Sequence, residues 1–237
     1  KAKMVQRHPF HLVDPSPWPL VASFGGLSLT FGGVLFMHNY EGGGELLFLG
    51  VLTILYVMFT WWRDIVREAL FEGQHTLAVQ QGLRMGMILF IVSEVMFFFA
   101  FFWAFFTSSI SPVFNIGGVW PPTDIIAISP WGLPFLNTIL LLSSGASVTW
   151  AHHAIVGGFQ KEAMGALGIT LVFAILFTFL QALEYYSAPF GMSDSVYGSV
   201  FFMATGFHGF HVIIGTIFLA ICNIRLSLYH FSRQHHF

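Results

Sequence analysis

Charge and cysteine are both scarce in this sequence. Only 8% of its 237 residues are Asp, Glu, Lys or Arg, whereas a typical soluble domain has about a quarter. A surface with so few charges cannot be fully solvated, so we expect an integral membrane protein rather than a soluble globular one. The single cysteine, Cys222, lies in an apolar run. A disulfide framework and a cysteine-based metal motif are therefore excluded.

Long apolar runs are abundant by contrast. A helix needs roughly 20 apolar residues to cross about 30 Å of hydrocarbon. Six stretches meet this requirement: Trp18–Met37, Leu46–Trp62, Leu83–Phe106, Leu133–Trp150, Ala163–Leu183 and Val196–Ile224. We predict an all-α fold, a polytopic transmembrane helix bundle. It forms a single domain over residues 1–237, with the first two helices in 1–66 and the remaining helices in 82–237.

Basic residues are missing from alternate connections. Residues 39–45, 107–130 and 184–195 contain no Lys or Arg, and all nine bases lie in the other connecting and terminal segments. By the positive-inside rule those segments face the cytoplasm or the mitochondrial matrix, and both ends of the sequence lie on that side. Scattered bases with a net charge of -2 argue against nucleic-acid binding. The N-terminal residues have no apolar core and predict no cleavable signal.

Small residues within the runs predict helix packing, because membrane helices approach closely where side chains are small. They occur in the first, third and fourth runs: Gly25, Gly26, Gly32, Gly33, Gly82, Gly86 and the Ser143–Ser147 stretch.

Glu94 is an ionisable residue in the middle of the third run. Its helical neighbours Phe90, Ile91, Phe97 and Phe98 are apolar, so a partner has to come from another helix or from water. Removal from water disfavours a charged carboxyl, and we expect it to be protonated or strongly hydrogen-bonded. Two interpretations stay open: a proton-linked or switching carboxyl, and a neutral hydrogen-bonding post that holds two helices together.

Two histidines lie on one face of the sixth run. His208 and His211 are three residues apart. Counted from Arg84 and Arg225, Glu94 lies about 15 Å deep and His211 about 21 Å deep, a difference that a tilted helix can close. We therefore predict a hydrogen bond from Glu94 to one of these imidazoles, with His211 preferred. Haem or metal ligation is the weaker alternative, because paired axial histidines usually come from different helices.

Arginines near the inner ends of the spans predict phospholipid binding. Arg63 and Arg67 follow the second run, and Arg225 with His230 follows the sixth. A guanidinium at headgroup depth suits the phosphate of cardiolipin or another glycerophospholipid. The alternative is a local ion pair, Arg63 with Asp64 or Arg67 with Glu68.

Several motifs in order carry a family resemblance. They are His11–Pro19, Trp61–Glu68, Ser93–Val95, Gly117–Pro122, Thr149–His153, Glu184–Phe190, Thr205–His211 and His235–Phe237. On these motifs the sequence resembles subunit III of the haem-copper oxidases, of the mitochondrial cytochrome c oxidase type. The resemblance covers the whole length.

The resemblance implies a non-catalytic subunit of the respiratory oxidase (complex IV), which transfers electrons from cytochrome c to dioxygen while pumping protons. Such a subunit has no haem or copper and no metal site; haem a and copper belong to partner subunits. It contacts subunit I above all, stabilises it, holds phospholipid in a cleft and supports proton uptake. The family's buried carboxyl matches Glu94, and its lipid-associated bases match Arg67, Arg225 and His230.

The resemblance also implies architecture and location. Family members have seven helices, of which the first two splay from the rest in a V, and they continue beyond the His-His-Phe of residues 235–237 into a last span. The N-terminal motif suggests the mitochondrial inner membrane, with the N-terminus in the matrix. Two alternatives remain: the equivalent subunit of a quinol oxidase, and an independent secondary transporter, which would show inverted repeats.

Overall fold

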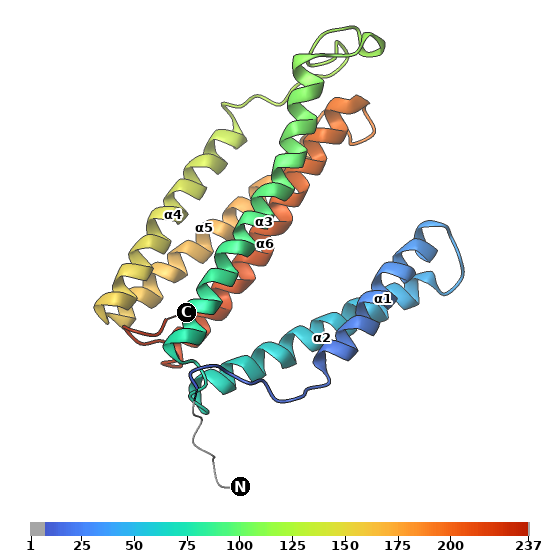
Figure 1. Cartoon of the computed structure of the whole chain (residues 1–237). Coiled ribbons are helices and arrows are strands. Elements are labelled where there is room, and N and C mark those ends of the chain that lie inside the picture. Colours follow the sequence, from blue (N-terminus) through green and yellow to red (C-terminus); the bar gives the residue numbers. More distant parts are fainter. Residues whose placement is uncertain (1–7, 237) are drawn as a thin grey trace. The chain divides into compact units, whose positions relative to one another are not determined.

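The computed structural model describes residues 8–236, and all regular structure in that range is helical. Its elements are α1 (Trp18–Met37), α2 (Gly43–Leu70), α3 (Leu77–Ile110), the short 3₁₀ helix η1 (Phe114–Ile116), α4 (Leu133–Gly157), α5 (Gln160–Ser187) and α6 (Ser195–Ser227). The six α-helices are all long and apolar enough to cross a membrane. The all-α, six-span prediction is confirmed (Figure 1).

The predicted spans are the apolar parts of longer helices. For α1 the prediction matches both ends, Trp18 and Met37. The second helix runs on past the predicted end at Trp62 as far as Leu70. Its added turns contain Arg63 and Arg67, which favour helix without being apolar, and Arg67 in the last turn suits the helix dipole.

Local sequence explains several helix ends. Pro19 stands in the first turn of α1, where a proline needs no backbone N–H partner. Helix α4 ends at Gly158, whose φ of 81° places it in the left-handed region that glycine adopts without strain. The backbone N–H of Gly158 donates to the carbonyls of Ala154 and Ile155.

The chain divides into two compact units. The first is Lys1–Gly86 and the second is Met87–Phe237, so that α3 begins in one and continues in the other. In the first unit α1 and α2 lie side by side as a hairpin (Figure 1). Three glycines form their contact. A Cβ on Gly32, Gly43 or Gly50 would lie 2.4, 2.5 or 2.4 Å from a backbone nitrogen of the facing helix.

In the second unit α5 packs between α4 and α6 (Figure 1). The α4–α5 contact consists of small residues: Ala151, Ala163 and Ala166 are at most 2% exposed. Across it the Ser147 and Thr170 hydroxyl oxygens are 2.7 Å apart. Close helix contact through small side chains is the usual form of packing in lipid.

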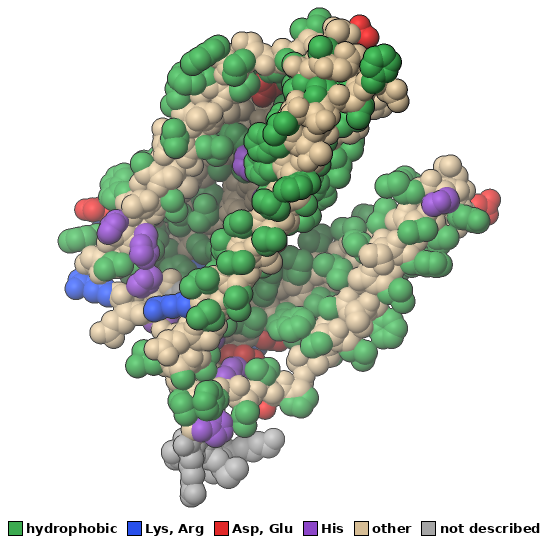
Figure 2. Space-filling view, turned by 45° about the horizontal axis from the view of Figure 1, so that its top comes forward, with side chains coloured by type: hydrophobic (Ala, Val, Ile, Leu, Met, Phe, Trp, Pro, Cys, Tyr) green, Lys and Arg blue, Asp and Glu red, His purple; other side chains and the backbone are tan. Residues whose placement is uncertain are grey.

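The other glycines that were predicted to pack differ in how closely a neighbouring helix approaches them. Gly25 lies against Thr53 and Ile54, whereas a Cβ on Gly26, Gly82, Gly86 or Gly145 would meet nothing within 4 Å among the described residues. Large apolar side chains cover the lengths of the helices instead (Figure 2). That distribution suits helices whose outer surfaces meet hydrocarbon rather than water.

Within each unit the described bases lie at one end of the helices. A hydrogen bond from Trp18 to Asp64 brings the start of α1 to the C-terminal part of α2, where Arg63 and Arg67 lie. In the second unit Gln160 is bonded to Leu226, which brings Lys161 and Arg225 to the same end. Four residues used in the sequence analysis lie outside the described range: the bases Lys1, Lys3 and Arg7, and Phe237 of the C-terminal motif.

Candidate functional site

The Glu94 carboxyl and the His211 imidazole meet between α3 and α6. Glu94 Oε2 and His211 Nε2 are 2.5 Å apart. The hydrogen bond predicted from the sequence is therefore present. Both side chains are about one-third exposed within this chain, at 29% and 36%, so the pair lies at the margin of the helix contact and not in a closed core.

A second hydrogen bond determines which ring nitrogen faces Glu94. His211 Nδ1 lies 2.6 Å from the carbonyl oxygen of Phe207. A carbonyl can only accept, so Nδ1 carries a proton and donates it. The Nε2–Oε2 contact is then made either by a protonated Glu94 that donates to a neutral imidazole, or by an imidazolium that donates to the carboxylate.

Aromatic rings lie beside the pair. The ring centroid of Phe98 lies 5.1 Å from that of His211 and Phe97 lies 6.1 Å away. Phe97 also packs edge-on against Phe207 of α6, at 5.1 Å. The Phe-rich stretch after Glu94 thus packs α3 against α6 on the C-terminal side of Glu94.

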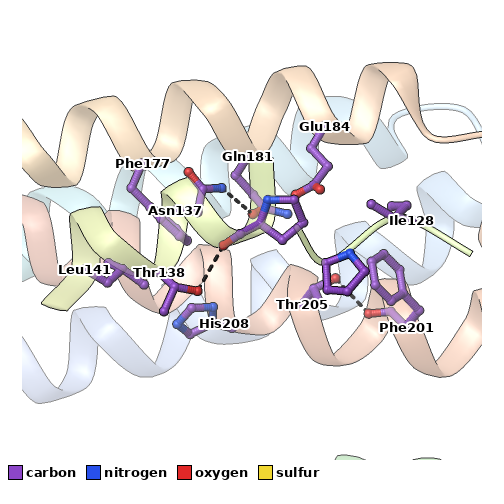
Figure 3. A pocket seen from close by; sticks show the side chains of 12 residues that line it. Ile128, Asn137, Thr138, Leu141, Phe177, Gln181, Glu184, Phe201, Thr205 and His208 are labelled. Carbon is purple, nitrogen blue, oxygen red and sulfur yellow. Dashed lines mark hydrogen bonds between the residues drawn. The ribbon is translucent and has the colours of Figure 1, made fainter. Parts of the chain in front are cut away.

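His208 does not join the Glu94 contact. It faces α5 instead, where its ring lies 6.0 Å from that of Phe177. Its side chain lines a cavity bounded by α4, α5 and α6 (Figure 3). The two histidines therefore lie in different surroundings although they are one helical turn apart.

The cavity contains a polar cluster that the sequence analysis missed. Asn137 of α4 and Glu184 of α5 are only 4% and 7% exposed. Asn137 Nδ2 donates to Gln181 Oε1 at 3.3 Å, and Figure 3 shows Gln181 between Asn137 and Glu184. Nearby, the Tyr185 hydroxyl donates to Thr205 Oγ1 at 2.5 Å. A signal was available, because Gln181 and Glu184 are spaced three residues apart at the end of an apolar run.

At the basic end of α6, Arg225 and His230 are partly enclosed. The Arg225 guanidinium carbon lies 4.6 Å from the centre of the Phe231 ring. Arg225 Nε and His230 Nδ1 are buried without a hydrogen-bond partner among the described residues. Burial, and then the charge of Arg225, lower the pKa of the His230 imidazole below its usual value.

At the end of α2, Arg63 forms the local ion pair that was the alternative to lipid binding. Its Nε and Nη2 donate to Asp64 Oδ1 at 3.0 and 2.8 Å. Asp64 Oδ2 accepts a further bond from Trp18 Nε1 at 2.7 Å. Glu68 lies 3.8 Å from His11 instead of pairing with Arg67. Within residues 8–236, Arg67 forms no ion pair. Arg63 is still nearly half exposed.

No group of three or more His, Cys, Asp or Glu side chains in the described part of the chain is arranged to hold a metal ion. The adjacent His152 and His153 have ring centroids 6.1 Å apart, and the His236 ring lies 5.3 Å from that of His152, tilted by 57°.

Comparison with known proteins identifies the family. A family model described as "Cytochrome c oxidase subunit III" matches residues 8–237. The cytochrome c oxidase subunit 3 of Pylaiella littoralis is 86% identical over 236 residues, 100% of this chain and 87% of the relative. Those of Marchantia polymorpha and Arabidopsis thaliana are each 63% identical, over 98% of this chain and 88% and 87% of the relatives.

These names support a subunit of cytochrome c oxidase, and they do not support the quinol oxidase or transporter alternatives. The chain belongs to the cytochrome c oxidase subunit III family, and with it to the respiratory oxidase complex.

Proposed function

We propose that this subunit supports the oxidase without catalysing its redox reaction, by holding phospholipid phosphate at its basic end. The observation that carries the proposal is the pair formed by Arg225 and His230. Each has a buried nitrogen with no partner in the described chain. Arg225 Nε can only donate, and His230 Nδ1 donates when it carries a proton, so both suit an acceptor that the described residues do not supply.

A phospholipid phosphate is an acceptor of the right kind. Arg225 lies two residues before the end of α6, at the level where headgroups meet the helix ends. A phosphate beside it would accept from Nε, and its negative charge would favour a protonated His230. Cardiolipin and other glycerophospholipids both offer this group.

The first unit offers a second set of bases. Arg67 lies in the last turn of α2, and Arg63 keeps part of its guanidinium exposed beside Asp64. We assign these two residues to lipid headgroups at their own helix end. A phosphate there would share Arg63 with Asp64, so Arg67 should contribute more to binding than Arg63.

The remaining parts of the proposal follow from family membership. Subunit I is the main protein contact and carries haem a and copper with its catalytic neighbours, and this chain stabilises it. The protein lies in the mitochondrial inner membrane with its N-terminus in the matrix. The concentration of bases on one side supports that orientation. Glu94, hydrogen-bonded to His211, is the residue through which the subunit would support proton uptake.

The experiment compares tagged oxidase carrying the natural sequence, Arg225→Ala or Lys161→Ala. Lys161 is an exposed base at the same end of the same unit, so it controls for general loss of positive charge. Each complex is purified in mild detergent. Phospholipid and co-purified subunits are measured by mass spectrometry, and haem a by the reduced-minus-oxidised spectrum.

We expect Arg225→Ala to retain less phospholipid and to lose activity sooner under turnover, with an unchanged haem a spectrum. Lys161→Ala should match the natural complex. Equal phospholipid content in all three would rule out the Arg225 headgroup site. A chain that purifies alone, without haem a, would contradict its role in the oxidase.

A further inference from the structure

The Asp64 carboxylate, near the end of α2, accepts hydrogen bonds from two helices. Its Oδ1 accepts from Nε and Nη2 of Arg63 in α2, at 3.0 and 2.8 Å. Its Oδ2 accepts from Nε1 of Trp18, the first residue of α1, at 2.7 Å. The carboxylate cannot turn toward another cation without losing the bond that joins the two helices. Arg63 therefore has a fixed counter-charge.

The ion pair takes up the part of Arg63 that is best suited to phosphate. An arginine binds a phosphate most strongly through two parallel N–H bonds from one edge of the guanidinium. In Arg63 the edge formed by Nε and Nη2 is directed at Asp64, although the side chain as a whole is 46% exposed. A phosphate beside Arg63 would meet the remaining N–H groups and little net positive charge.

Arg67 differs from Arg63 in this respect. It lies in the last turn of α2, is exposed, and has no ion pair of its own in the described part of the chain. Its acidic neighbour Glu68 lies near His11 instead. Trp62, an exposed aromatic residue of the kind found at membrane interfaces, comes just before this pair of arginines. The end of α2 therefore offers one uncompensated guanidinium at headgroup level.

We propose that Asp64 selects the phospholipid headgroup at this end of the first unit. By balancing the charge of Arg63, it leaves one arginine for one phosphate, and it disfavours cardiolipin, whose headgroup carries two phosphates. Specificity of this kind is a difference between two affinities, and a fixed carboxylate reduces the affinity for the more anionic lipid. The inference rests on the headgroup role proposed above for Arg63 and Arg67, and it is independent of Arg225.

Asp64→Asn isolates the effect of the carboxylate charge. The asparagine keeps one side-chain oxygen that can accept from Trp18, but its NH₂ group cannot accept from Arg63. Arg63 is then free to bind phosphate. A further base at headgroup level should strengthen the binding of an anionic lipid about fivefold.

The experiment measures lipid binding to the assembled oxidase. The complex is purified in mild detergent and equilibrated with mixed micelles that contain equal amounts of cardiolipin and phosphatidylethanolamine, in a buffer without phosphate. Native mass spectrometry then counts the molecules of each lipid that stay bound. Asp64→Asn should gain a cardiolipin relative to the natural complex. Combining it with Arg63→Ala should abolish the gain, because the gain requires the released guanidinium.

Asp14→Asn is the matched control. Asp14 is an exposed acid in the segment between His11 and Trp18, so its replacement removes a negative charge from the same unit without releasing an arginine. Its cardiolipin count should equal that of the natural complex. A gain in Asp14→Asn as large as in Asp64→Asn would overturn the inference, because general electrostatics would then explain both.

Arg67→Ala separates this inference from the proposal on which it rests. It should cost the natural complex a molecule of phosphatidylethanolamine. If no lipid is lost, this helix end binds no headgroup, and both the proposal and the inference fail there. If lipid is lost but Asp64→Asn gains no cardiolipin, or if the double variant keeps the gain, Asp64 does not select the headgroup, although the role of Arg67 stands.

A further comparison covers the case in which Asp64→Asn does not assemble. In the natural background, Arg63→Ala should lose less lipid than Arg67→Ala, because Asp64 already balances the charge of Arg63. Equal losses in these two variants would overturn the inference.

Discussion

At the scale of single residues, the carbonyl of Phe207 decides how Glu94 and His211 interact. It accepts from His211 Nδ1, so Nε2 is left to face the carboxyl. If the imidazole is neutral, the Glu94 hydroxyl donates to Nε2, an arrangement that avoids two charges in hydrocarbon. In either protonation state the contact joins α3 to α6, and it suits a proton-linked carboxyl as well as a hydrogen-bonding post.

This arrangement makes Glu94→Gln a mild substitution. The glutamine amide can donate to His211 Nε2 as the protonated acid does, so we expect assembly, measured by the haem a spectrum of the purified complex, and initial turnover to remain near natural levels. Glu94→Leu, which cannot donate, should cost about 1–3 kcal/mol of stability by leaving Nε2 without a partner. Loss of assembly in Glu94→Gln would show that the proton or charge itself is required.

The two buried acids also show what the sequence could reveal. Glu94 was identifiable because apolar residues surround it in a long run, and its depth and that of His211 could be counted from Arg84 and Arg225. Glu184 was overlooked because it falls just past Leu183, the last residue of the predicted span. Its burial depends on how α5 packs against its neighbouring helices, and contacts between helices are not encoded in the pattern of any one helix.

At the scale of the helices, α1 and α2 approach so closely that their backbones touch at glycines. A Cβ at Gly50 would lie 2.4 Å from the backbone nitrogen of Leu29, a clash that no side-chain rotation can relieve. A Cβ at Gly26 of α1 would meet nothing within 4 Å among the described residues. The two positions therefore form a matched pair of glycines in one hairpin.

We expect Gly50→Ala to destabilise the hairpin by about 1–3 kcal/mol, the usual cost of overpacking. Gly26→Ala should be neutral or slightly stabilising, because alanine favours helix over glycine by about 1 kcal/mol. Thermal denaturation of the purified complex measures both. Equal effects of the two substitutions would mean that helix propensity, and not the close approach, governs this hairpin.

The glycines illustrate a second limit of sequence analysis. Gly32 was predicted to pack and does, whereas a Cβ on Gly26 in the same run would meet nothing within 4 Å among the described residues. Gly43 and Gly50 of α2 were not singled out, although they form the opposite side of the same contact. Composition identifies helices that can approach closely, whereas the faces that meet depend on the rotation of each helix about its axis.

At the scale of the whole molecule, the distribution of bases predicts which loops share a side of the membrane. Phe71 follows α2 and is 79% exposed, and Phe114 lies in the base-free connection after α3 and is 94% exposed. Cysteines placed at these two positions should react with a membrane-impermeant maleimide from opposite sides. Phe71→Cys should be labelled from the matrix side in inverted vesicles, and Phe114→Cys from the other side in intact mitoplasts. Labelling of both from one side would contradict the topology.

The lengths of the helices have a consequence for the bilayer itself. Helix α1 has 20 residues, about 30 Å, which just equals the usual thickness of hydrocarbon. Helix α3 has 34 residues, about 51 Å, and can meet a thicker membrane by tilting or by emerging from it. A helix of minimal length has no such reserve, so lipids with longer acyl chains must compress around α1. In a thicker membrane we therefore expect hydrophobic mismatch first at α1, the shortest of the six described α-helices.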